Sequence, residues 1–438
     1  FFIFLYLQWI KRLTTPAKII AFAFRRYAKR PFLIQPANNT MAGQPANNLS
    51  YSFYDCQERT AQLIKFFQKK ALRTGEFIAY WSGNNVDYFE IRAAAALHGV
   101  VLLGLPQHLA PTDAIYFLEK AKAQILFYRH KGVDIATIAK GAKIDTCIDL
   151  DGSAYAEIFR GQTAHYTYHS TPEMLSTLNV SSGTTAATPK IIALTNQNWA
   201  SSVFAYVLNS DTNPKKNIIF LCTVPFVTAG STTFLPTLLA GISSVVMSEP
   251  FSAERVIALI NQQGVNRLYL TPSWLIELLE TCKQKQERLA SLDTIIVGTD
   301  SMPPQRLKEA IEFFGPKFTI GYGMVEVLPP LTLLSANDYT GPTGISEPRL
   351  HSVGKALKGV RIAIVDEKRN PQPFETVGTI AIKSTTMSQG YFQNPAGTEH
   401  CFKDGWFYTQ DYGYCDRDGY LYILGRESTV LSKTNDGS

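Results

Sequence analysis

Amphipathic stretches and short apolar runs alternate along most of the chain. Residues 55–71 carry apolar side chains at the spacing of an α-helix, and the apolar run 77–81 that follows predicts a strand. The same alternation returns between residues 217 and 271. Strands that alternate with helices are typical of parallel sheets covered by helices. Because the region from Asp55 to about Leu334 is long, we expect two such sheets.

The pattern changes after Pro348. Short alternating runs such as 361–365 are punctuated by turn-forming pairs such as Asn370-Pro371, which predicts a small antiparallel barrel or meander. The expected fold class is therefore α/β, with two helix-covered, mainly parallel sheets and a small β-barrel subdomain. We place these three subdomains at residues 1–170, 171–347 and 348–425.

A polar loop near the middle of the chain holds candidate chemistry. It lies between the apolar runs 178–180 and 191–194, so we expect it to be the turn between two buried strands. Backbone N–H groups at a glycine turn, hydroxyl groups and a lysine ammonium are the donors and the charge that a polyphosphate needs. The alternative is an ordinary solvated turn. The candidate phosphate-binding residues are Ser182, Gly183, Thr184, Thr185 and Lys190.

Composition and charge narrow the class of protein. With 45% hydrophobic and 18% charged residues, the sequence is ordinary for a globular protein. The net charge is +6, but the seven basic residues from Lys11 to Arg30 contribute +7, with no acidic residue before Asp55. The remaining 35 basic and 36 acidic residues nearly cancel, which argues against a nucleic-acid-binding protein.

The basic N-terminal stretch allows two interpretations. The apolar start, residues 1–7, is too short to span a bilayer, and positive charge follows it rather than precedes it. We expect an ordinary terminal helix that packs on the domain, and the alternative is peripheral membrane contact through the basic residues. Six cysteines without CxxC spacing favour free thiols and a cytoplasmic location, and they offer no zinc site.

Four further motifs follow the loop in a fixed order. Tyr322-Gly323-Met324-Val325-Glu326 comes first, and the segments 352–357, 405–411 and 419–426 follow it. Together with the loop, this order resembles the adenylate-forming superfamily, which includes acyl- and aryl-CoA synthetases, nonribosomal peptide adenylation domains and firefly luciferase. The resemblance runs from about Leu49 to the C-terminus and covers the large N-terminal domain of such an enzyme. It implies that residues 426–438 are a hinge leading to a small C-terminal domain outside this chain.

The resemblance implies ATP and Mg²⁺ as cofactors, and a thiol acceptor that is either CoA or the phosphopantetheine of a carrier protein. The polar loop would contact the β- and γ-phosphates of ATP. Lys190 and Glu326 would be the catalytic residues. Glu326 would also hold Mg²⁺, a hard cation that takes carboxylate and phosphate oxygens. Considered without its motif, Glu326 would be a surface or helix-capping acid.

The resemblance also implies which residues contact the adenosine moiety of ATP. Tyr322 and Gly323 would lie at the adenine ring, and Asp411 would accept hydrogen bonds from the ribose hydroxyls. Arg426 would reach the ribose or a phosphate. The loop Gly298-Thr299-Asp300 would line the adenine and acyl pockets. Ordinary structural roles compete with these assignments, since an aromatic residue after a strand is often core and an aspartate before a glycine often forms a turn.

The chain departs from the family pattern at several positions. Ala186 stands where the phosphate loop usually repeats glycine, Asn196 where histidine is usual, Val325 where threonine is usual, and Gln410 where glycine is usual. The hydrogen bond that Val325 cannot make is worth about 1 kcal/mol. Together with the domain outside the chain, these changes predict impaired turnover by the chain as it stands.

The segment 225–231 bears on the acid that would be activated. Amino-acid-activating members carry an aspartate near this segment to bind the α-ammonium group, and here the segment has no acidic residue. A buried ammonium without a counter-charge is costly, so a fatty or aromatic acid is favoured. Three hypotheses remain: an acyl- or aryl-CoA synthetase, an acyl-AMP ligase that loads a carrier protein, and a degenerate nucleotide-binding scaffold.

Overall fold

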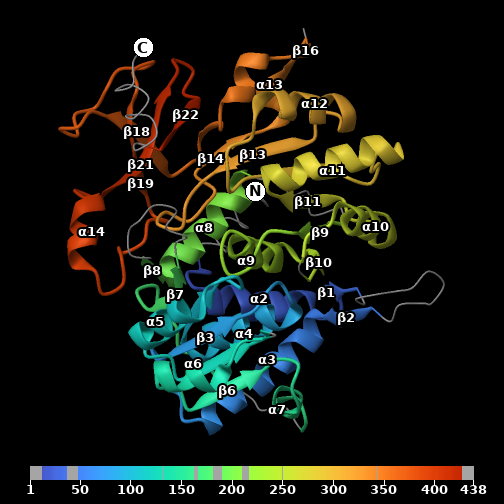
Figure 1. The fold of residues 1–438 in the computed structure, drawn as a ribbon, viewed down its shortest axis with the longest axis vertical. Coiled ribbons are helices and arrows are strands. Elements are labelled where there is room, and N and C mark those ends of the chain that lie inside the picture. The colour runs from blue at the N-terminus through green and yellow to red at the C-terminus, as the bar shows by residue number, and fades with distance from the viewer. Residues whose placement is uncertain are drawn as a thin grey trace. The chain divides into compact units, whose positions relative to one another are not determined.

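The structure is a computed structural model of the chain. It describes residues 12–36, 48–130, 132–161, 166–180, 190–209, 217–248, 250–342 and 344–426. The chain folds into two compact units, whose elements are labelled in Figure 1. The first unit consists of the residues up to Val203 together with 212–251, and the second consists of 204–211 together with the residues from Ser252 onward.

The first unit contains a six-stranded sheet in the order β6-β5-β3-β4-β7-β8. Its strands are β3 (Phe77–Trp81), β4 (Val101–Leu105), β5 (Ile125–Tyr128), β6 (Thr146–Asp149), β7 (Leu175–Val180) and β8 (Ile191–Thr195). All neighbours are parallel except β7 and β8, which pair antiparallel. The strand prediction for residues 77–81 is confirmed, and so is the prediction that the polar loop connects two buried strands.

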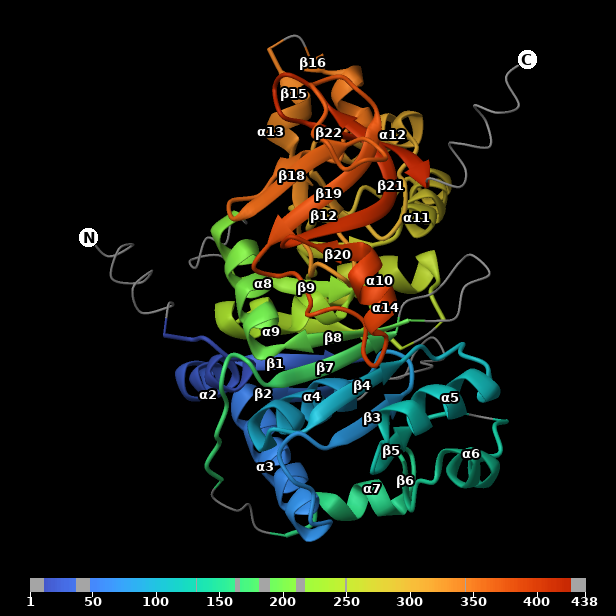
Figure 2. The same ribbon diagram turned by 90° about the vertical axis from the view of Figure 1, so that its left-hand side faces the viewer.

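Helices flank this sheet, as Figure 2 shows. They are α3 (Phe53–Lys69), α4 (Val86–His98), α5 (Pro111–Ala121), α6 (Ile135–Ala142) and α7 (Ser153–Ile158). α3 begins at a capping box: Ser52 Oγ accepts from the Asp55 N–H at 3.1 Å, and the Asp55 carboxylate accepts from the Ser52 N–H at 2.8 Å. These bonds satisfy backbone donors that the first helical turn would otherwise leave unpaired.

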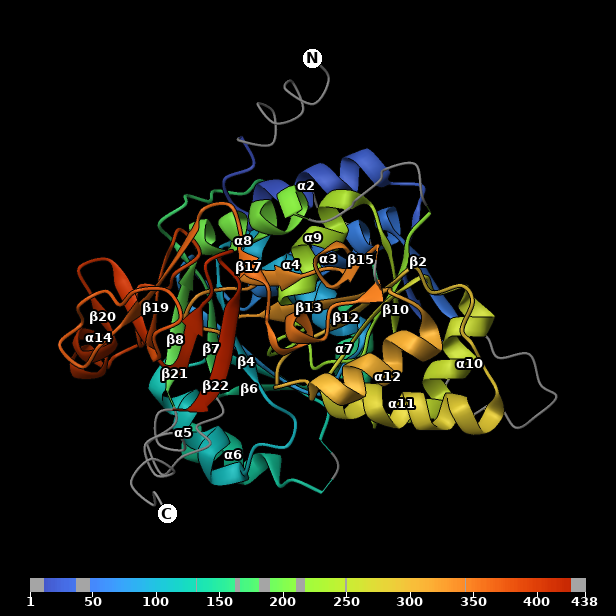
Figure 3. The ribbon, with the colours of Figure 1, turned by 90° about the horizontal axis from the view of Figure 1, so that it is seen from above.

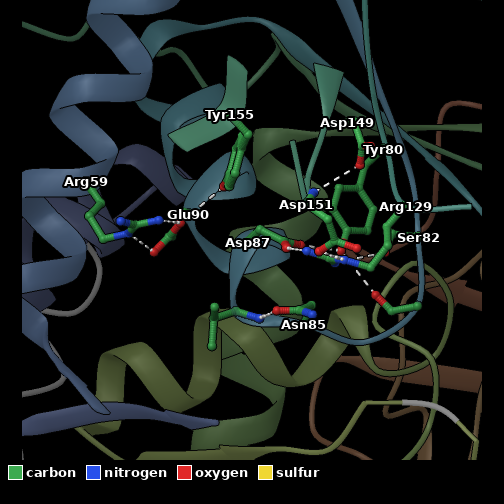
Figure 4. A network of polar contacts seen from close by, with 12 residues as sticks. Arg59, Tyr80, Ser82, Asn85, Asp87, Glu90, Arg129, Asp149, Asp151 and Tyr155 are labelled. Atoms are coloured by element: carbon green, nitrogen blue, oxygen red, sulfur yellow. Dashed lines mark hydrogen bonds and ion pairs between the residues drawn. The ribbon is translucent and has the colours of Figure 1, made fainter. Parts of the chain in front are cut away.

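α4 carries three charged side chains into the protein interior, those of Asp87, Glu90 and Arg92. Figure 4 shows the partners of the two carboxylates: Arg129 donates to Asp87 at 2.6 Å, and Arg59 pairs with Glu90. Buried charges are costly unless they are paired and hydrogen-bonded. The position of α4 is therefore tied to the neighbouring α3 and to the end of β5.

A second set of strands in the first unit brings distant segments of the sequence together. They are β1 (Pro31–Gln35), β2 (Leu49–Ser52), β9 (Ile219–Cys222) and β10 (Ser243–Val246). β10 pairs parallel with both β9 and β1, and β2 pairs antiparallel with β1. β1, from the predicted subdomain 1–170, thus pairs with β10, from the predicted subdomain 171–347. β7 and β8, which also belong to 171–347, complete the six-stranded sheet that is otherwise built from residues 1–170.

The N-terminal basic stretch includes a packed helix, α2 (Pro16–Tyr27). Thr15 caps its N-terminus, and the helix buries Ile19, Ile20 and Phe24 while packing on α9 (Ser231–Ala240). Residues 1–11 lie outside the described residues. In the described ranges of the chain, no helix is both long enough and apolar enough to cross a membrane.

The second unit begins with three parallel strands and two antiparallel ones. In spatial order they are β11 (Arg267–Leu270), β12 (Thr294–Val297), β13 (Phe318–Tyr322), β14 (Thr332–Leu334) and β17 (Lys355–Ala356). Three helices accompany these strands: α10 (Ala253–Gln263), α11 (Pro272–Lys285) and α12 (Pro304–Phe314). α11 packs against both of the others, and Figure 3 shows α11 and α12 side by side.

The rest of the second unit contains the predicted antiparallel sheet. It comprises β18 (Val360–Val365), β19 (Gly378–Ser384), β21 (Trp406–Cys415), β20 (Phe402–Lys403) and β22 (Leu421–Arg426), with β21 pairing to β19, β20 and β22. Smaller elements are α13 (Ala336–Tyr339), β15 (Thr340–Gly341), β16 (Gly344–Ile345), the 3₁₀ turn η1 (Glu347–His351) and α14 (Pro395–Cys401). α8 (Asn196–Asn209) carries the chain from the first unit into the second.

Candidate functional site

Three residues of the predicted adenosine site meet in the second unit. Asp411 on β21 is paired in register with Arg426 on β22. Tyr322 Oη, at the end of β13, donates to Asp411 Oδ2 at 2.7 Å, and Arg426 Nε lies 3.1 Å from Asp411 Oδ1. Both carboxylate oxygens are engaged, and each keeps acceptor capacity for a further donor. The fold therefore brings together residues that three separate motifs supply.

Burial fixes the donor role of Tyr322 in this cluster. Asp411 is only 7% exposed, and its backbone N–H donates to Thr409 Oγ1 at 3.0 Å. Burial and, after it, the charge of Asp411 raise the pKa of Tyr322 well above its usual value. The phenol therefore stays protonated at neutral pH and orients the carboxylate. The Arg426 side chain, in contrast, is 59% exposed.

The loop after β12 lies beside the end of β13. A Cβ on Gly298 would meet the Gly321 carbonyl at 3.3 Å, one residue before Tyr322. Thr299 has a φ of 81°, in the left-handed region that non-glycine residues seldom adopt. Asp300 is exposed, and its Oδ1 accepts from the Ser301 N–H at 2.7 Å. The loop thus approaches the end of β13 that carries Tyr322, while the Asp300 carboxylate accepts a hydrogen bond within its own turn.

The turn after β13 positions Gly323 and Glu326. A Cβ on Gly323 would overlap Pro329, so only glycine fits there. The Glu326 carbonyl accepts from the Ser388 N–H at 2.8 Å, and its Oε1 accepts from Tyr391 Oη at 3.3 Å. Burial and the Glu326 charge raise the pKa of Tyr391 well above its usual value, so Tyr391 remains a donor.

The sequence motifs gave no sign of Tyr391. It follows the turn at Gly390 and contacts Glu326 from 65 positions away, a pairing that no local spacing reveals. Thr409, which holds the Asp411 backbone from two residues before it, lies in the motif 405–411 but is not among the candidate site residues. Tyr391 orients the carboxylate of Glu326, and Thr409 holds the backbone of Asp411, although neither belongs to the candidate set.

Glu326 has the chemistry of a magnesium ligand that acts with a nucleotide. In the described ranges, no group of three or more His, Cys, Asp and Glu side chains is arranged to hold a metal ion. Mg²⁺ is usually bound through one or two carboxylates, with substrate phosphates and water supplying the other oxygens. A single half-buried carboxylate fits that mode of binding.

The predicted phosphate loop lies partly outside the described residues. This applies to Ser182, Gly183, Thr184 and Thr185, and also to Ala186. The two ends of the loop are adjacent, because Val180 on β7 is paired with Ile191 on β8. Lys190, half-buried in the first unit, directly precedes β8. Its role at a phosphate stays a prediction.

Two of the atypical residues have identifiable surroundings. Asn196, where the family usually has histidine, begins α8, and its Nδ2 donates to Ser170 Oγ at 3.0 Å and to the Thr171 carbonyl at 2.8 Å. It therefore holds the segment before β7. Gln410 is exposed beside the buried Asp411, so its side chain does not displace the carboxylate.

Fold and site together define a class of protein. The AMP-binding enzyme family model matches residues 22–392, which is most of the chain. The chain belongs to this family. It is 27% identical over 427 residues to the medium/long-chain-fatty-acid–CoA ligase FadD8 of Mycobacterium tuberculosis, covering 93% of this chain and 71% of that protein. It is 30% identical over 373 residues to the 2-succinylbenzoate–CoA ligase of Bacillus subtilis, covering 82% and 70%.

Solved structures share the fold. The inhibitor-bound N-terminal domain of FACL13 from Mycobacterium tuberculosis gives a TM-score of 0.83 at 19% identity, covering 94% of this chain and 100% of that one. The O-succinylbenzoate CoA synthetase of Bacillus subtilis in complex with AMP gives 0.78 at 23% identity, covering 94% and 78%. The predicted resemblance, the α/β fold class and the enzyme class, an AMP-forming acid–thiol ligase, are confirmed.

Proposed function

We propose that this protein activates a fatty or aromatic acid with ATP, releases pyrophosphate, and transfers the acyl group from the acyl-adenylate to the thiol of CoA. The observation that carries the proposal is the Asp411 carboxylate, which Tyr322 and Arg426 orient from two sides. A carboxylate held in this way can accept hydrogen bonds from both ribose hydroxyls. Family membership and the names of the relatives support the same reaction.

In the proposed reaction, an oxygen of the acid attacks the α-phosphorus of ATP, and the bond to pyrophosphate breaks. Two anions must meet, so the site has to neutralise charge and align the attacking and leaving oxygens. We assign charge neutralisation to Lys190 and alignment of the adenosine to Tyr322 and Asp411. Hydroxyls of the loop 182–185 would hold the β- and γ-phosphates.

Glu326 would hold Mg²⁺ together with phosphate oxygens of the nucleotide. When bound, the ion would neutralise charge on the departing pyrophosphate. Tyr391 contributes by donating to Glu326 Oε1, which fixes the direction of the carboxylate. Because removal of such a supporting hydrogen bond weakens the binding of a metal, we include Tyr391 in the proposed site.

The nature of the acid follows from the segment 223–231, which we propose lines the acid pocket. The segment contains no carboxylate to pair with an α-ammonium group. Its buried side chains include those of Val224, Phe226 and Val227. An apolar lining favours fatty or aromatic acids. The fatty-acid and 2-succinylbenzoate ligases among the relatives support this class.

The test is acid-dependent exchange of pyrophosphate into ATP, measured over a series of fatty and aromatic acids with the full-length protein. We expect exchange with at least one acid. If no acid supports exchange although ATP binds measurably, the enzymatic hypotheses are wrong and the protein is a degenerate nucleotide-binding scaffold. Acyl transfer to CoA would then separate the CoA ligase from a ligase that acylates only the phosphopantetheine of a carrier protein.

A further inference from the structure

The segment Thr223–Ser231 folds back on itself, and side chains from other parts of the first unit hold it by hydrogen bonds. Asn84 Nδ2 donates to the Val224 carbonyl at 3.0 Å, and Asn84 Oδ1 accepts from the Phe226 N–H at 2.7 Å. A Cβ on Gly230 would approach the Val224 carbonyl to 2.7 Å, so the turn closes tightly on itself. The shape of this segment therefore depends on side chains from other elements.

Arg92 on α4 holds the far end of the segment. Its Nη1 donates to the Ser231 carbonyl at 2.9 Å and to Tyr88 Oη at 2.8 Å. The guanidinium lies over the rings of Trp199, at 4.0 Å from the centroid, and Phe234, at 5.1 Å. Hydrogen bonds and aromatic faces thus surround a cation that is only 4% exposed.

No carboxylate among the described residues pairs with Arg92, whereas the half-buried Arg59 and Arg129 each pair with a carboxylate of α4. A buried cation without a counter-ion is more costly than a methionine of similar length. Packing alone would therefore favour an apolar side chain at this position. What an apolar side chain cannot supply is the donor to the Ser231 carbonyl.

A series of contacts leads from Arg92 through Trp199 and β7 back to the same segment. One of the two rings that Arg92 covers is that of Trp199, which lies on α8. Trp199 Nε1 donates to Thr177 Oγ1 at 3.0 Å. Thr177 Oγ1 donates to Asn179 Oδ1 at 2.8 Å, and Asn179 Nδ2 reaches the Val227 carbonyl at 3.4 Å. Thr177 and Asn179 lie on β7, so the segment is tied to the six-stranded sheet at its middle and, through Arg92, to α4 at its end.

We propose that Arg92 is a positioning residue that sets the backbone of the acid-binding segment and thereby determines which acids fit. This inference rests on the proposed function, which makes 223–231 the lining of the acid pocket. Arg92 acts through the Ser231 carbonyl and through Trp199 and does not contact the reacting atoms. Its loss shifts the segment and weakens binding of the acid without changing the binding of ATP.

The kinetic test compares R92M, R92K and Y88F with the wild-type protein. We expect the acid KM to rise about tenfold in R92M, the equivalent of one lost charged hydrogen bond, with the ATP KM unchanged. R92K keeps a donor for the Ser231 carbonyl and should recover some of the loss. Y88F removes only the second partner of Arg92 and should change the acid KM less. Preference among acids of different length should broaden in R92M.

The matched control is Y155F. Tyr155, like Tyr88, is a buried phenol bonded to a charged side chain, but its partner is Glu90 at 3.3 Å. Y155F should leave the acid KM at its wild-type value. An acid KM in folded R92M and Y88F equal to that of the wild type contradicts the proposal. So does an equal rise of the acid and ATP KM values, which would indicate general loss of structure.

Hydrogen exchange of the backbone amides in 223–231, measured without substrates, separates this inference from the proposed function. We expect faster exchange in R92M, or in Y88F and W199F if R92M does not fold, and wild-type exchange in Y155F. Unchanged protection in these variants overturns the role of Arg92, whatever the activity. Faster exchange in a protein without acid-dependent activity supports the effect of Arg92 on the backbone of 223–231, but it overturns the proposed function and with it the effect of Arg92 on the choice of acid.

Discussion

Asp411 is the residue on which the proposed nucleotide site depends most directly. Replacing it with asparagine keeps the shape but removes the charge that faces Arg426 and one acceptor for a ribose hydroxyl. We expect D411N to raise the ATP KM by about tenfold to a hundredfold, in line with the loss of charged hydrogen bonds. The measurement is the ATP KM, accompanied by calorimetric ATP binding.

The control for D411N is D404N, which removes an exposed carboxylate from the turn before β21. D404N should leave ATP binding unchanged. If D411N binds ATP as the wild type does, the ribose assignment is wrong. Y322F offers a finer comparison, because it keeps the aromatic ring and removes only the donor to Asp411 Oδ2.

The ion pair of the half-buried Arg59 with the buried Glu90 gives a second prediction at the residue scale (Figure 4). The Glu90 side chain is fully buried, and Tyr155 Oη also donates to it at 3.3 Å. R59M leaves this carboxylate without a counter-charge and should lower the free energy of unfolding by about 3–5 kcal/mol at pH 7. Chemical denaturation measures this loss. The exposed pair of Arg160 and Glu157 provides the control R160M, with a change below about 1 kcal/mol.

The loss in R59M should depend on pH. Burial raises the pKa of Glu90, although the Arg59 charge opposes the shift. A carboxyl group whose folded pKa lies above its unfolded value favours the folded state when it is protonated, so its contribution to stability falls as pH rises through these values. The difference between R59M and wild type should therefore shrink as pH is lowered toward 4.5, the usual pKa. A loss that is constant with pH would mean that Glu90 is not the cause.

At the scale of elements, Asp416 joins the end of β21 to η1. Its Oδ1 accepts from the Tyr420 N–H at 2.9 Å, and Arg349 of η1 pairs with the other oxygen. Burial acts to raise the pKa of Asp416, but the Tyr420 N–H and Arg349 together lower it below its usual value of 3.8. The carboxylate form is thus the one that stabilises the folded state.

We expect D416N to lower the free energy of unfolding by about 1 kcal/mol at pH 7, because the partly solvated pair is screened. The stabilisation is present above the unfolded pKa of 3.8 and is lost as pH falls through the lower folded pKa, so D416N and wild type should converge near pH 3. Denaturation at both pH values tests this. The more exposed partner Asp418 gives the control D418N, with a smaller effect at pH 7.

Elements with local signals were predictable, and elements defined by distant pairing were not. The run 77–81 is apolar throughout because β3 is buried on both faces, and this run predicted the strand. The pairing of β1 with β10 joins Leu33 to Ser244, and no periodicity in either segment encodes it. The candidate site follows the same rule: motifs gave Tyr322, Asp411 and Arg426, but not the supporting Tyr391.

For the whole molecule, binding of ATP with Mg²⁺ should stabilise the folded chain independently of catalysis. At a ligand concentration about one hundred times the Kd, the expected gain is about 2.7 kcal/mol, which raises the melting temperature. Differential scanning fluorimetry with and without the nucleotide measures the shift. D411N should abolish most of it, and D404N should not. A wild-type protein that shows no shift at any nucleotide concentration would contradict nucleotide binding itself.

The pairing of β1 with β10 has a consequence for synthesis of the chain. β1 leaves the ribosome about 210 residues before its parallel partner, as the match of Leu33 with Ser244 shows, and translation at roughly 5–20 residues per second makes that delay about 10–40 s. Throughout this interval the nascent polypeptide presents an open strand edge, which is a template for association with other chains. We expect newly made protein to depend on holding chaperones until translation passes Val246.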